Sequence, residues 1–408
     1  MRNIYLSVFA LFIFSGLLFS NCNSSVNDGG KEVEDLSCIV EGVNAVDGYI
    51  SAWERCTRNA AEDLHRITLR SLDGDVQVQV SDTLYSAYSP LIWENAGHLM
   101  VMYAENRDMD SQQIVHHAHR IEMKTYTLGG ELVSGETLME ARPGTFGTFQ
   151  MPFGKVERTP NSTLVYWSDN EVESVSRTAH LFEIENGKVT ASQYLTGTRA
   201  MSTPHAIQDT DRYIFTFMAS LSPHEIEEDG VETDRNSIFL VETDAQFQPL
   251  SEEIVINMGG DSDWGVRPAV SKLGDNYAVV FLSNNSPSAS LARLNIRIYD
   301  PETKSVIHSE TDDHYTYLTH QIVSDAEGNL LVFYTEADMG YSAGAYNLRV
   351  KTMEQGSLQT NDQFVMSLTN PNFFIEKLEG NLVRLYHGGT SSGEPVSARQ
   401  LNLASLGN

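Results

Sequence analysis

Three stretches of the chain place basic and aromatic side chains directly before apolar segments that are typical of β-strands. They read TRAMSTPH, DSDWGVRP and DHYTYLTH. Arginine pairs with carboxylates, histidine exchanges protons and aromatic rings cover apolar faces, so these residue types suit an anionic or sugar-like ligand. The alternative is that each side chain only braces its strand. The candidate ligand-binding residues are Arg199, His205, Asp263, Trp264, Arg267, His314, Tyr315 and His320.

The segments that must position these residues belong to a repeat. One copy, RPAVSKLGDNYAVVF, contains an apolar strand, a tight turn and a second apolar strand that ends on an aromatic residue. Successive copies lie 50 residues (Trp53 to Tyr103) to 64 residues (Tyr103 to Trp167) apart, which suits one four-stranded unit per copy. The seven copies end at Trp53, Tyr103, Trp167, Phe217, Phe281, Tyr334 and Tyr386.

Each copy is followed by a strand that alternates polar and apolar residues, and six copies continue through a turn into another short strand. Turns such as LDGD, LGGE and ENGK supply the positive φ angles that tight hairpins need. A small sheet cannot bury two apolar faces alone, whereas seven sheets stacked radially bury one another. The sequence therefore predicts an all-β fold, a seven-bladed β-propeller of four-stranded antiparallel blades, with the terminal aromatic residues packed between blades.

The last copy differs from the others because no clear fourth strand follows in ARQLNLASLGN. We expect the segment near Cys38 to Val43 to help close the ring. Over residues 38–408 the chain resembles β-propellers in general. It lacks the signatures of the WD repeat, of the sialidases and of the integrin-type calcium repeats, so the resemblance does not imply the activities of those families.

The connections of such a propeller lie on two faces. Turns within each repeated phrase, such as LGDN and LEGN, are short, whereas connections from the second to the third strand, such as ASLSPHEIEEDGVETDRN, are long. Long loops on one face of a rigid scaffold are the usual place for binding. The stretches with the candidate residues lie on that same face, nearest the axis. We therefore expect a protein or carbohydrate ligand there.

Two histidines in VHHAHR, His117 and His119, could form a metal pair on one face of a strand. His65 and His180 stand at the position of His119 in neighbouring repeats, which favours packing within the repeat over metal binding. The sequence contains no phosphate-binding loop, nucleophile elbow or zinc-type cysteine set. It predicts no metal site and no cofactor.

Residues 1–22 resemble an export signal that ends in a bacterial lipoprotein box. Arg2 precedes an apolar run from Ile4 to Phe19 that is short for a membrane span, and LFSNC ends at Cys22. The resemblance implies that Cys22 is lipidated and anchors the chain at the outer membrane or cell surface. A plain cleaved signal, with a periplasmic or secreted protein, is the alternative. Residues 23–37 have the polar composition of a flexible tether.

The chain has three cysteines, and lipidation of Cys22 would leave Cys38 and Cys56. In an oxidising compartment these two could form a disulfide, and two free, buried thiols are the alternative. The formal net charge is −28, from 55 acidic and 27 basic residues. Such a surface repels phosphate backbones and anionic lipids, so we expect a monomer that binds no nucleic acid and meets the membrane only through its lipid.

Two functions fit these observations, and a purely architectural envelope component with neither ligand nor activity is a third hypothesis. The first is a cell-envelope lipoprotein whose propeller binds a protein or a glycan, because an anchor and a tether occur without a catalytic motif. The second is an extracellular polysaccharide lyase or glycoside hydrolase, because some propellers of this blade number cleave uronic-acid polymers with His, Tyr and Arg at the axial cavity. By that resemblance His205, His320, Tyr315 and Arg267 would be base, acid and carboxylate clamp in some order.

Overall fold

The fold is built of strands throughout the part of the chain that a computed structural model describes. The chain divides into two units, Met1–Asp35 and Leu36–Asn408, and all described residues belong to the second. None of their helices is long and apolar enough to cross a membrane. The described residues are 37–59, 62–82, 85–106, 120–140, 149–169, 178–196, 198, 202–220, 236–257, 264–284, 293–312, 316–337, 346–388 and 396–406.

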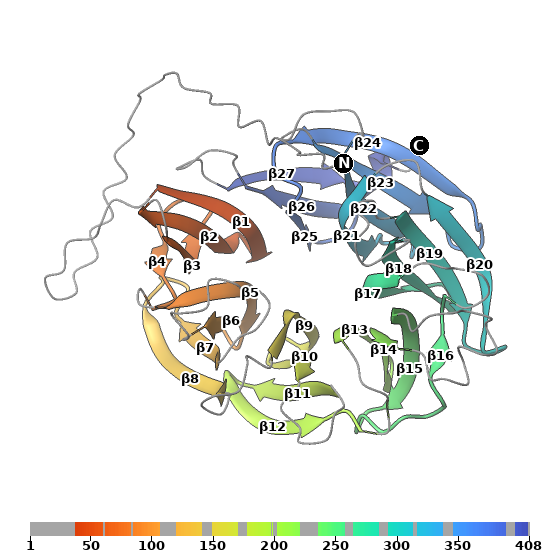
Figure 1. The fold of residues 1–408 in the computed structure, drawn as a ribbon, viewed down its shortest axis with the longest axis horizontal. Coiled ribbons are helices and arrows are strands. Elements are labelled where there is room, and N and C mark those ends of the chain that lie inside the picture. Colours follow the sequence, from red (N-terminus) through yellow and green to blue (C-terminus); the bar gives the residue numbers. More distant parts are fainter. Residues whose placement is uncertain are drawn as a thin grey trace, which may run out of the picture. The chain divides into compact units, whose positions relative to one another are not determined.

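These residues form seven antiparallel sheets, each made of strands that follow one another in sequence (Figure 1). The first sheet contains β1 (Ser37–Val46), β2 (Tyr49–Asn59), β3 (Glu62–Ser71) and β4 (Gln77–Gln79). The second contains β5 (Ser86–Asn95), β6 (His98–Asn106), β7 (Arg120–Tyr126) and β8 (Leu132–Glu140). The third contains β9 (Phe149–Thr159), β10 (Ser162–Asp169), β11 (Thr178–Glu185) and β12 (Lys188–Tyr194).

The remaining four sheets repeat the pattern. The fourth contains β13 (Ser202–Asp209), β14 (Arg212–Ser220), β15 (Asn236–Asp244) and β16 (Ile254–Val255). The fifth contains β17 (Trp264–Leu273), β18 (Asn276–Asn284), β19 (Arg293–Asp300) and β20 (Ser305–Asp312). The sixth contains β21 (Thr316–Ser324), β22 (Leu330–Ala337), β23 (Tyr346–Met353) and β24 (Thr360–Leu368). The seventh contains β25 (Phe373–Lys377), β26 (Leu382–His387) and β27 (Ser397–Asn402), and a 3-10 helix follows at Leu403–Ser405.

This arrangement confirms the predicted seven-bladed β-propeller. In Figure 1 the first strand of each blade lies nearest the centre, and neighbouring first strands contact one another around the ring. Local turn chemistry explains why the hairpins form where they do. Asn186 and Gly187, with φ of 50° and 75°, join β11 to β12 in the left-handed conformations that a two-residue hairpin requires. Among the described residues the seventh blade has three strands, in keeping with the missing fourth strand of the last copy.

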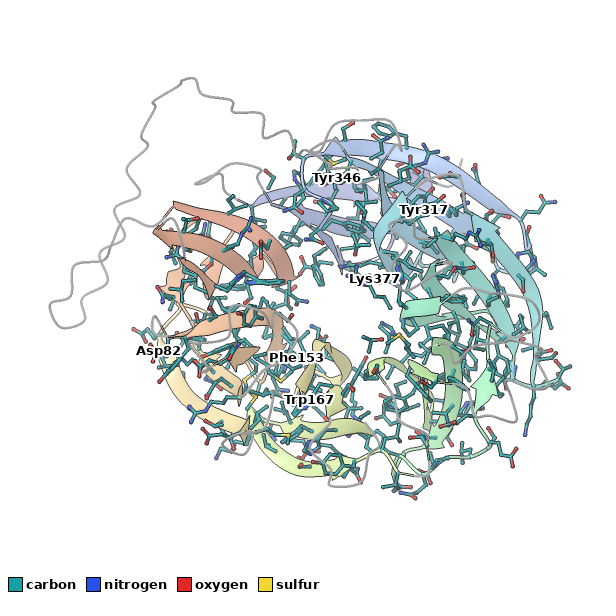
Figure 2. All side chains as sticks on the ribbon, in the orientation of Figure 1. Asp82, Phe153, Trp167, Tyr317, Tyr346 and Lys377 are labelled. Atoms are coloured by element: carbon teal, nitrogen blue, oxygen red, sulfur yellow. A yellow bond between two sulfur atoms is a disulfide. The ribbon has the colours of Figure 1, made fainter. Side chains whose placement is uncertain are left out.

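The aromatic residues that end the repeated phrases form the packing between blades. Six of them, at the equivalent place in the second strands, are at most 1% exposed: Tyr103, Trp167, Phe217, Phe281, Tyr334 and Tyr386. Trp167, for example, lies edge-on to Phe153 with ring centroids 6.0 Å apart (Figure 2). The seventh, Trp53, is only partly buried. The interblade prediction therefore holds for Trp53 as well, since it packs against Tyr88 of the second blade, but Trp53 stays partly exposed.

The ring closes where the seventh blade meets the first. Asn370 Nδ2 donates to Val40 O at 3.0 Å, and Asn372 Nδ2 donates to Glu41 O at 2.6 Å. Tyr386 packs in one apolar cluster with Val40. The N-terminal segment thus contacts the last blade through side chains, while β1 itself pairs with β2 inside the first blade. Closure therefore rests on interblade packing and amide hydrogen bonds.

Candidate functional site

Three of the predicted ligand-binding residues are described with their side chains: His205, Arg267 and His320. They lie on the inner strands β13, β17 and β21 of three consecutive blades, and each is the fourth or fifth residue of its strand. Trp264 begins β17, and its side chain lies outside the described residues. The other predicted residues, Arg199, Asp263, His314 and Tyr315, lie outside them altogether.

The three described residues connect neighbouring blades, and we call them the inner-strand cluster. His205 Nδ1 accepts a hydrogen bond from the Val270 N–H of the fifth blade at 3.2 Å. Arg267 Nη1 donates to Leu318 O of the sixth blade at 2.8 Å. β17 contacts both β13 and β21, so the three side chains lie on adjacent inner strands.

Electrostatics keeps both histidines of the cluster neutral at pH 7. Burial lowers the pKa of His205 to about 4 because a charged imidazolium loses its hydration there. Burial likewise lowers the pKa of His320 to about 4, helped by the positive charge of Arg267 and by His205. Since His205 Nδ1 accepts a hydrogen bond, its neutral ring carries the proton on Nε2. His320 Nδ1 is a buried atom with no hydrogen-bond partner among the described residues.

Arg267 is the charged member of the cluster. Arg267 keeps solvent-accessible surface, but the inner strands around it remove enough water from the guanidinium to lower its pKa, and no charged neighbour among the described residues contributes. An arginine stays protonated at neutral pH even after such a shift. One of its five N–H donors is engaged by Leu318 O, so a guanidinium edge remains for an anionic ligand.

The backbone under Arg267 is strained. β17 contains a β-bulge between Val266 and Ala269, and Arg267, which precedes Pro268, has φ of 53°. A residue before proline disfavours helical conformations, and the left-handed region is costly for any side chain other than glycine. Ser89 and Thr203, which also precede prolines in bulged inner strands, have φ of 50° and 47°. Such bulges re-aim side chains near functional sites, and the sequence signal for them was the recurring X-Pro pair.

The contact that His205 makes is also part of a structural pattern. Asn44 Oδ1 accepts from Ile92 N at 3.2 Å, and Gln321 Oε1 accepts from Ile375 N at 2.7 Å. In each case a side chain of one inner strand satisfies a backbone N–H of the next blade. His205 therefore both braces the ring through Nδ1 and carries an Nε2–H that this brace does not use. The sequence analysis did not identify Asn44 and Gln321.

The histidines that follow the terminal aromatic residues are packing residues, as predicted. His180 stacks on Tyr194 with centroids 4.1 Å apart, and its Nε2 lies 2.8 Å from Ser192 Oγ. Trp53 Nε1 donates to His65 Nδ1 at 3.0 Å. His117 and His119 lie outside the described residues.

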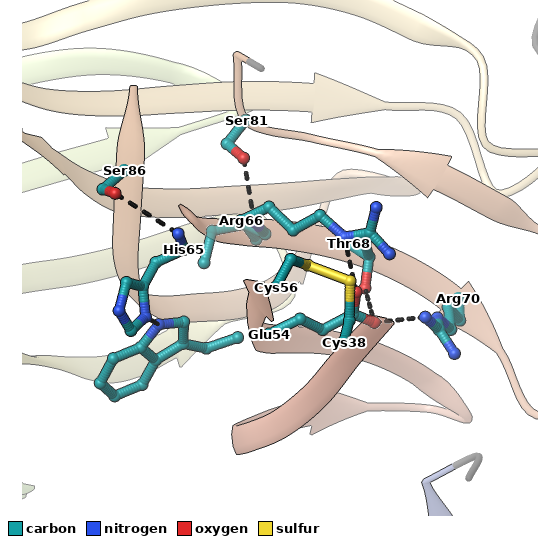
Figure 3. The surroundings of a disulfide bond; sticks show 11 residues. Cys38, Glu54, Cys56, His65, Arg66, Thr68, Arg70, Ser81 and Ser86 are labelled. Carbon is teal, nitrogen blue, oxygen red and sulfur yellow. Dashed lines mark hydrogen bonds and ion pairs between the residues drawn. A yellow bond between two sulfur atoms is a disulfide. The ribbon is translucent and has the colours of Figure 1, made fainter. Parts of the chain in front are cut away.

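The predicted disulfide is present between Cys38 and Cys56, with Cα atoms 4.0 Å apart (Figure 3). The two cysteines are direct partners in the β1–β2 ladder. Glu54 lies beside them, and these three residues form the one group of potential metal ligands among the described residues. Both sulfurs are consumed by the disulfide, and Glu54 accepts from Arg66 Nε at 2.7 Å, so the group does not fit a metal ion.

No protein-family model and no curated protein matches the chain. A solved ulvan lyase of polysaccharide lyase family PL25, bound to -[GlcA(1-4)Rha3S]-, matches with TM-score 0.56 and 8% identity over 90% of this chain and 92% of its own. Polysaccharide lyase Uly1 matches with TM-score 0.51 and 10% identity over 92% and 91%. The GH93 α-L-arabinofuranosidase of Fusarium graminearum matches with TM-score 0.48 and 12% identity over 80% and 96%. At 8% and 10% identity, the two lyase matches show a shared fold alone.

Proposed function

We propose that the protein is a polysaccharide lyase that cleaves a uronic-acid-containing polysaccharide at the inner-strand cluster. The observation that carries the proposal is one solvent-exposed arginine, Arg267, beside two neutral histidines, His205 and His320. Elimination next to a carboxylate needs a cation that binds the carboxylate and a neutral base that takes the adjacent proton. The inner-strand cluster supplies both kinds of group.

In this mechanism Arg267 pairs with the uronate carboxylate and stabilises the negative charge that develops as the C5–H bond breaks. The neutral imidazole of His320 takes the C5 proton. The electron pair of that bond forms the C4=C5 double bond, the C4–O4 bond breaks, and O4 takes a proton from Tyr315 or from water. The Nε2–H of His205 holds a substrate oxygen by hydrogen bonding.

Substrate binding would adjust the base for this role. The positive charge of Arg267 is one of the causes that lower the pKa of His320. A bound carboxylate neutralises that charge and so raises the pKa of His320 towards the range in which a histidine accepts protons well. The same residues would therefore bind the acidic sugar and activate the base only when it is present.

Hydrolysis is the weaker alternative. Glycoside hydrolases generally use two carboxylates on opposite sides of the scissile bond. Within the described part of the chain no carboxylate contributes to the pKa of His205, Arg267 or His320. The ulvan lyase and Uly1, which match with TM-scores of 0.56 and 0.51, are both polysaccharide lyases, and this supports elimination as the reaction class.

The test is incubation of the purified full chain with ulvan, polygalacturonate, alginate and neutral polysaccharides. A lyase produces 4,5-unsaturated uronate ends that absorb in the ultraviolet, whereas a hydrolase produces reducing ends without that absorbance. New unsaturated ends with an acidic polymer support the proposal. Reducing ends alone would replace it with hydrolysis, and binding without either product would favour a glycan-binding lipoprotein.

We also propose that the protein is anchored in the bacterial cell envelope through a lipid on Cys22. Support comes from the charge and apolar run before this residue and from the disulfide, which suits an oxidising compartment. Metabolic labelling with a fatty-acid analogue should tag the wild type and leave Cys22→Ser untagged. Equal labelling of both, or of neither, would remove the anchor.

A further inference from the structure

A surface pocket separate from the inner-strand cluster lies where the seventh blade meets the first. We call it the seam pocket, and its volume is about 360 Å³, within the range of small-ligand sites. β1 starts on the same face as β17 and β21, so the seam pocket and the inner-strand cluster share one face of the propeller. Its lining residues are Ile39, Glu41, Trp53, Arg55, Thr369, Asn370, Pro371 and Asn372.

Trp53 sets the seam pocket apart from the other interblade positions. It occupies the place at which the six other terminal aromatic residues are at most 1% exposed, yet it is only partly buried and lines an open pocket. Trp167 is the matched position, since it too packs beside a histidine, His180, and is fully buried. Trp53 packs on the second blade, against Tyr88, and the part of its side chain that stays exposed lines the seam pocket.

The indole of Trp53 is held rigidly from behind. Its Nε1 donates to His65 Nδ1 at 3.0 Å, and Tyr88 lies edge-on to it with centroids 5.8 Å apart. Tyr88 and His65 contact each other as well, with centroids 5.0 Å apart. A ring fixed in this way loses little entropy when a ligand stacks on it.

The walls of the seam pocket are fixed too. Asn370 and Asn372 hold the approach to β25 against the β1 backbone through the two closure hydrogen bonds. Ile39 and Arg55 are direct partners in the β1–β2 ladder, next to the Cys38–Cys56 disulfide. The pocket is thus pre-formed by a covalent bond on one side and by amide hydrogen bonds on the other.

The charge of the pocket lining is balanced. Arg55, the one cation among the described residues that line it, pairs with Glu41 at 2.9 Å between Nε and Oε1. A ligand carboxylate in this pocket would be repelled by Glu41, and the Arg55 cation is already paired with Glu41. Sugar hydroxyl groups can donate to Glu41 and accept from Arg55. An aromatic ring beside polar groups that carry both donors and acceptors suits a sugar ring with an apolar face and a hydroxylated edge.

We propose that the seam pocket is a carbohydrate subsite that takes a neutral sugar unit, stacked on Trp53 and bonded through its hydroxyls to Arg55, Glu41 and Asn372. This ligand class follows from the pocket's own residues. That the neutral unit belongs to the same polymer that reaches Arg267 rests on the proposed function. A polysaccharide with both acidic and neutral units would then contact both sites on one face.

The experiment uses the indole N–H signals of the full chain in a nitrogen–proton NMR spectrum. The chain has four tryptophans, Trp53, Trp93, Trp167 and Trp264, and Trp→Phe variants assign their signals. The probes are neutral oligosaccharides of glucose, xylose, galactose, mannose, arabinose or rhamnose, and acidic oligogalacturonate and glucuronate oligomers. At least one neutral probe should shift the Trp53 signal, while the buried Trp93 and Trp167 stay unchanged.

Variants separate this subsite from the proposed activity. Trp53→Ala should weaken binding of the active neutral probe about tenfold, as expected for loss of one stacked ring. Phe364→Ala, which removes an exposed aromatic ring on β24, should not change it. Arg267→Ala should leave neutral-probe binding intact even if it abolishes cleavage. If the wild type shows no lyase activity but a neutral probe still shifts the Trp53 signal, the proposed function is refuted and the subsite is not. No shift of Trp53 with any neutral probe, or a shift only with acidic probes, overturns the subsite.

Discussion

The inner-strand cluster and the seam pocket use the same backbone device with different side chains. In both, a β-bulge near the start of an inner strand presents one residue, Arg267 in β17 and Glu41 in β1. In both, a side chain donates to the bulge carbonyl of the next blade. Arg267 donates to Leu318 O at 2.8 Å, and Asn372 donates to Glu41 O at 2.6 Å.

The two regions differ in charge compensation. No charged neighbour among the described residues contributes to the pKa of Arg267, whereas Glu41 is paired with Arg55 at 2.9 Å. One site can therefore bind an anion, and the other suits a neutral ligand. The comparison teaches that the repeated backbone provides the interblade hydrogen bond at both bulges. The identity of one or two side chains then determines whether the site suits an anionic or a neutral ligand.

The largest expected effect is on turnover at the inner-strand cluster. Arg267→Ala should lower kcat/KM for an acidic polysaccharide by about 10²–10⁴, because the developing negative charge loses its cation. Its melting temperature should stay close to that of the wild type, since the side chain is exposed and gives up a single hydrogen bond to Leu318 O. Steady-state kinetics and thermal unfolding of the same preparation measure both quantities.

The control for that variant is a true packing residue. Phe281→Ala, at a side chain that is 1% exposed between blades, should lower the free energy of unfolding by about 3–5 kcal/mol. Denaturant unfolding gives the comparison directly. If Arg267→Ala destabilises the fold as much as Phe281→Ala does, Arg267 is a bracing residue and the two regions differ less than proposed.

Removal of the disulfide tests the seam. Replacing both Cys38 and Cys56 by alanine should lower the free energy of unfolding by about 3 kcal/mol, because the bridge closes a loop with a sequence separation of 18. The same change should weaken neutral-sugar binding at the seam pocket while leaving cleavage of an acidic polymer nearly unchanged. Equal losses at both sites would show that the two regions are not independent.

The smallest effect concerns acid stability and His205. Its pKa is about 4 in the folded protein and near the ordinary 6.5 when unfolded, so the unfolded state binds the proton first as pH falls. Stability should therefore be full above about pH 6.5 and decline towards pH 4. His205→Gln can keep an acceptor for Val270 N–H, as Gln321 does for Ile375, without the titrating ring. Between pH 7 and pH 5, the free energy of unfolding of this variant should fall by about 1–2 kcal/mol less than that of the wild type. An unchanged pH dependence would contradict the lowered pKa.

Much of the fold was readable from the sequence because its determinants are local. The apolar alternation and the terminal aromatic residues recur in every blade, tight turns such as Gly129-Gly130 and Asn186-Gly187 join strands within single blades, and each feature needs only its own hairpin to act. The Cys38–Cys56 disulfide was one of two alternatives that the cysteine count and the expected export signal left open, and the structure contains it. These features determined the seven blades and the residues between them.

Only the tertiary structure decided which of these residues work together. Arg267 and His320 are 53 positions apart, and Asn372 meets Glu41 across 331, so no local pattern records either contact. The partial exposure of Trp53, at a position where the six other repeats bury their aromatic residue, likewise depends on residues of the first, second and seventh blades together. Burial and charge pairing are properties of neighbours from other blades. The sequence therefore identified candidate side chains such as Arg267. Only the folded ring determines that no charged neighbour among the described residues acts on Arg267, whereas Glu41 is paired with Arg55.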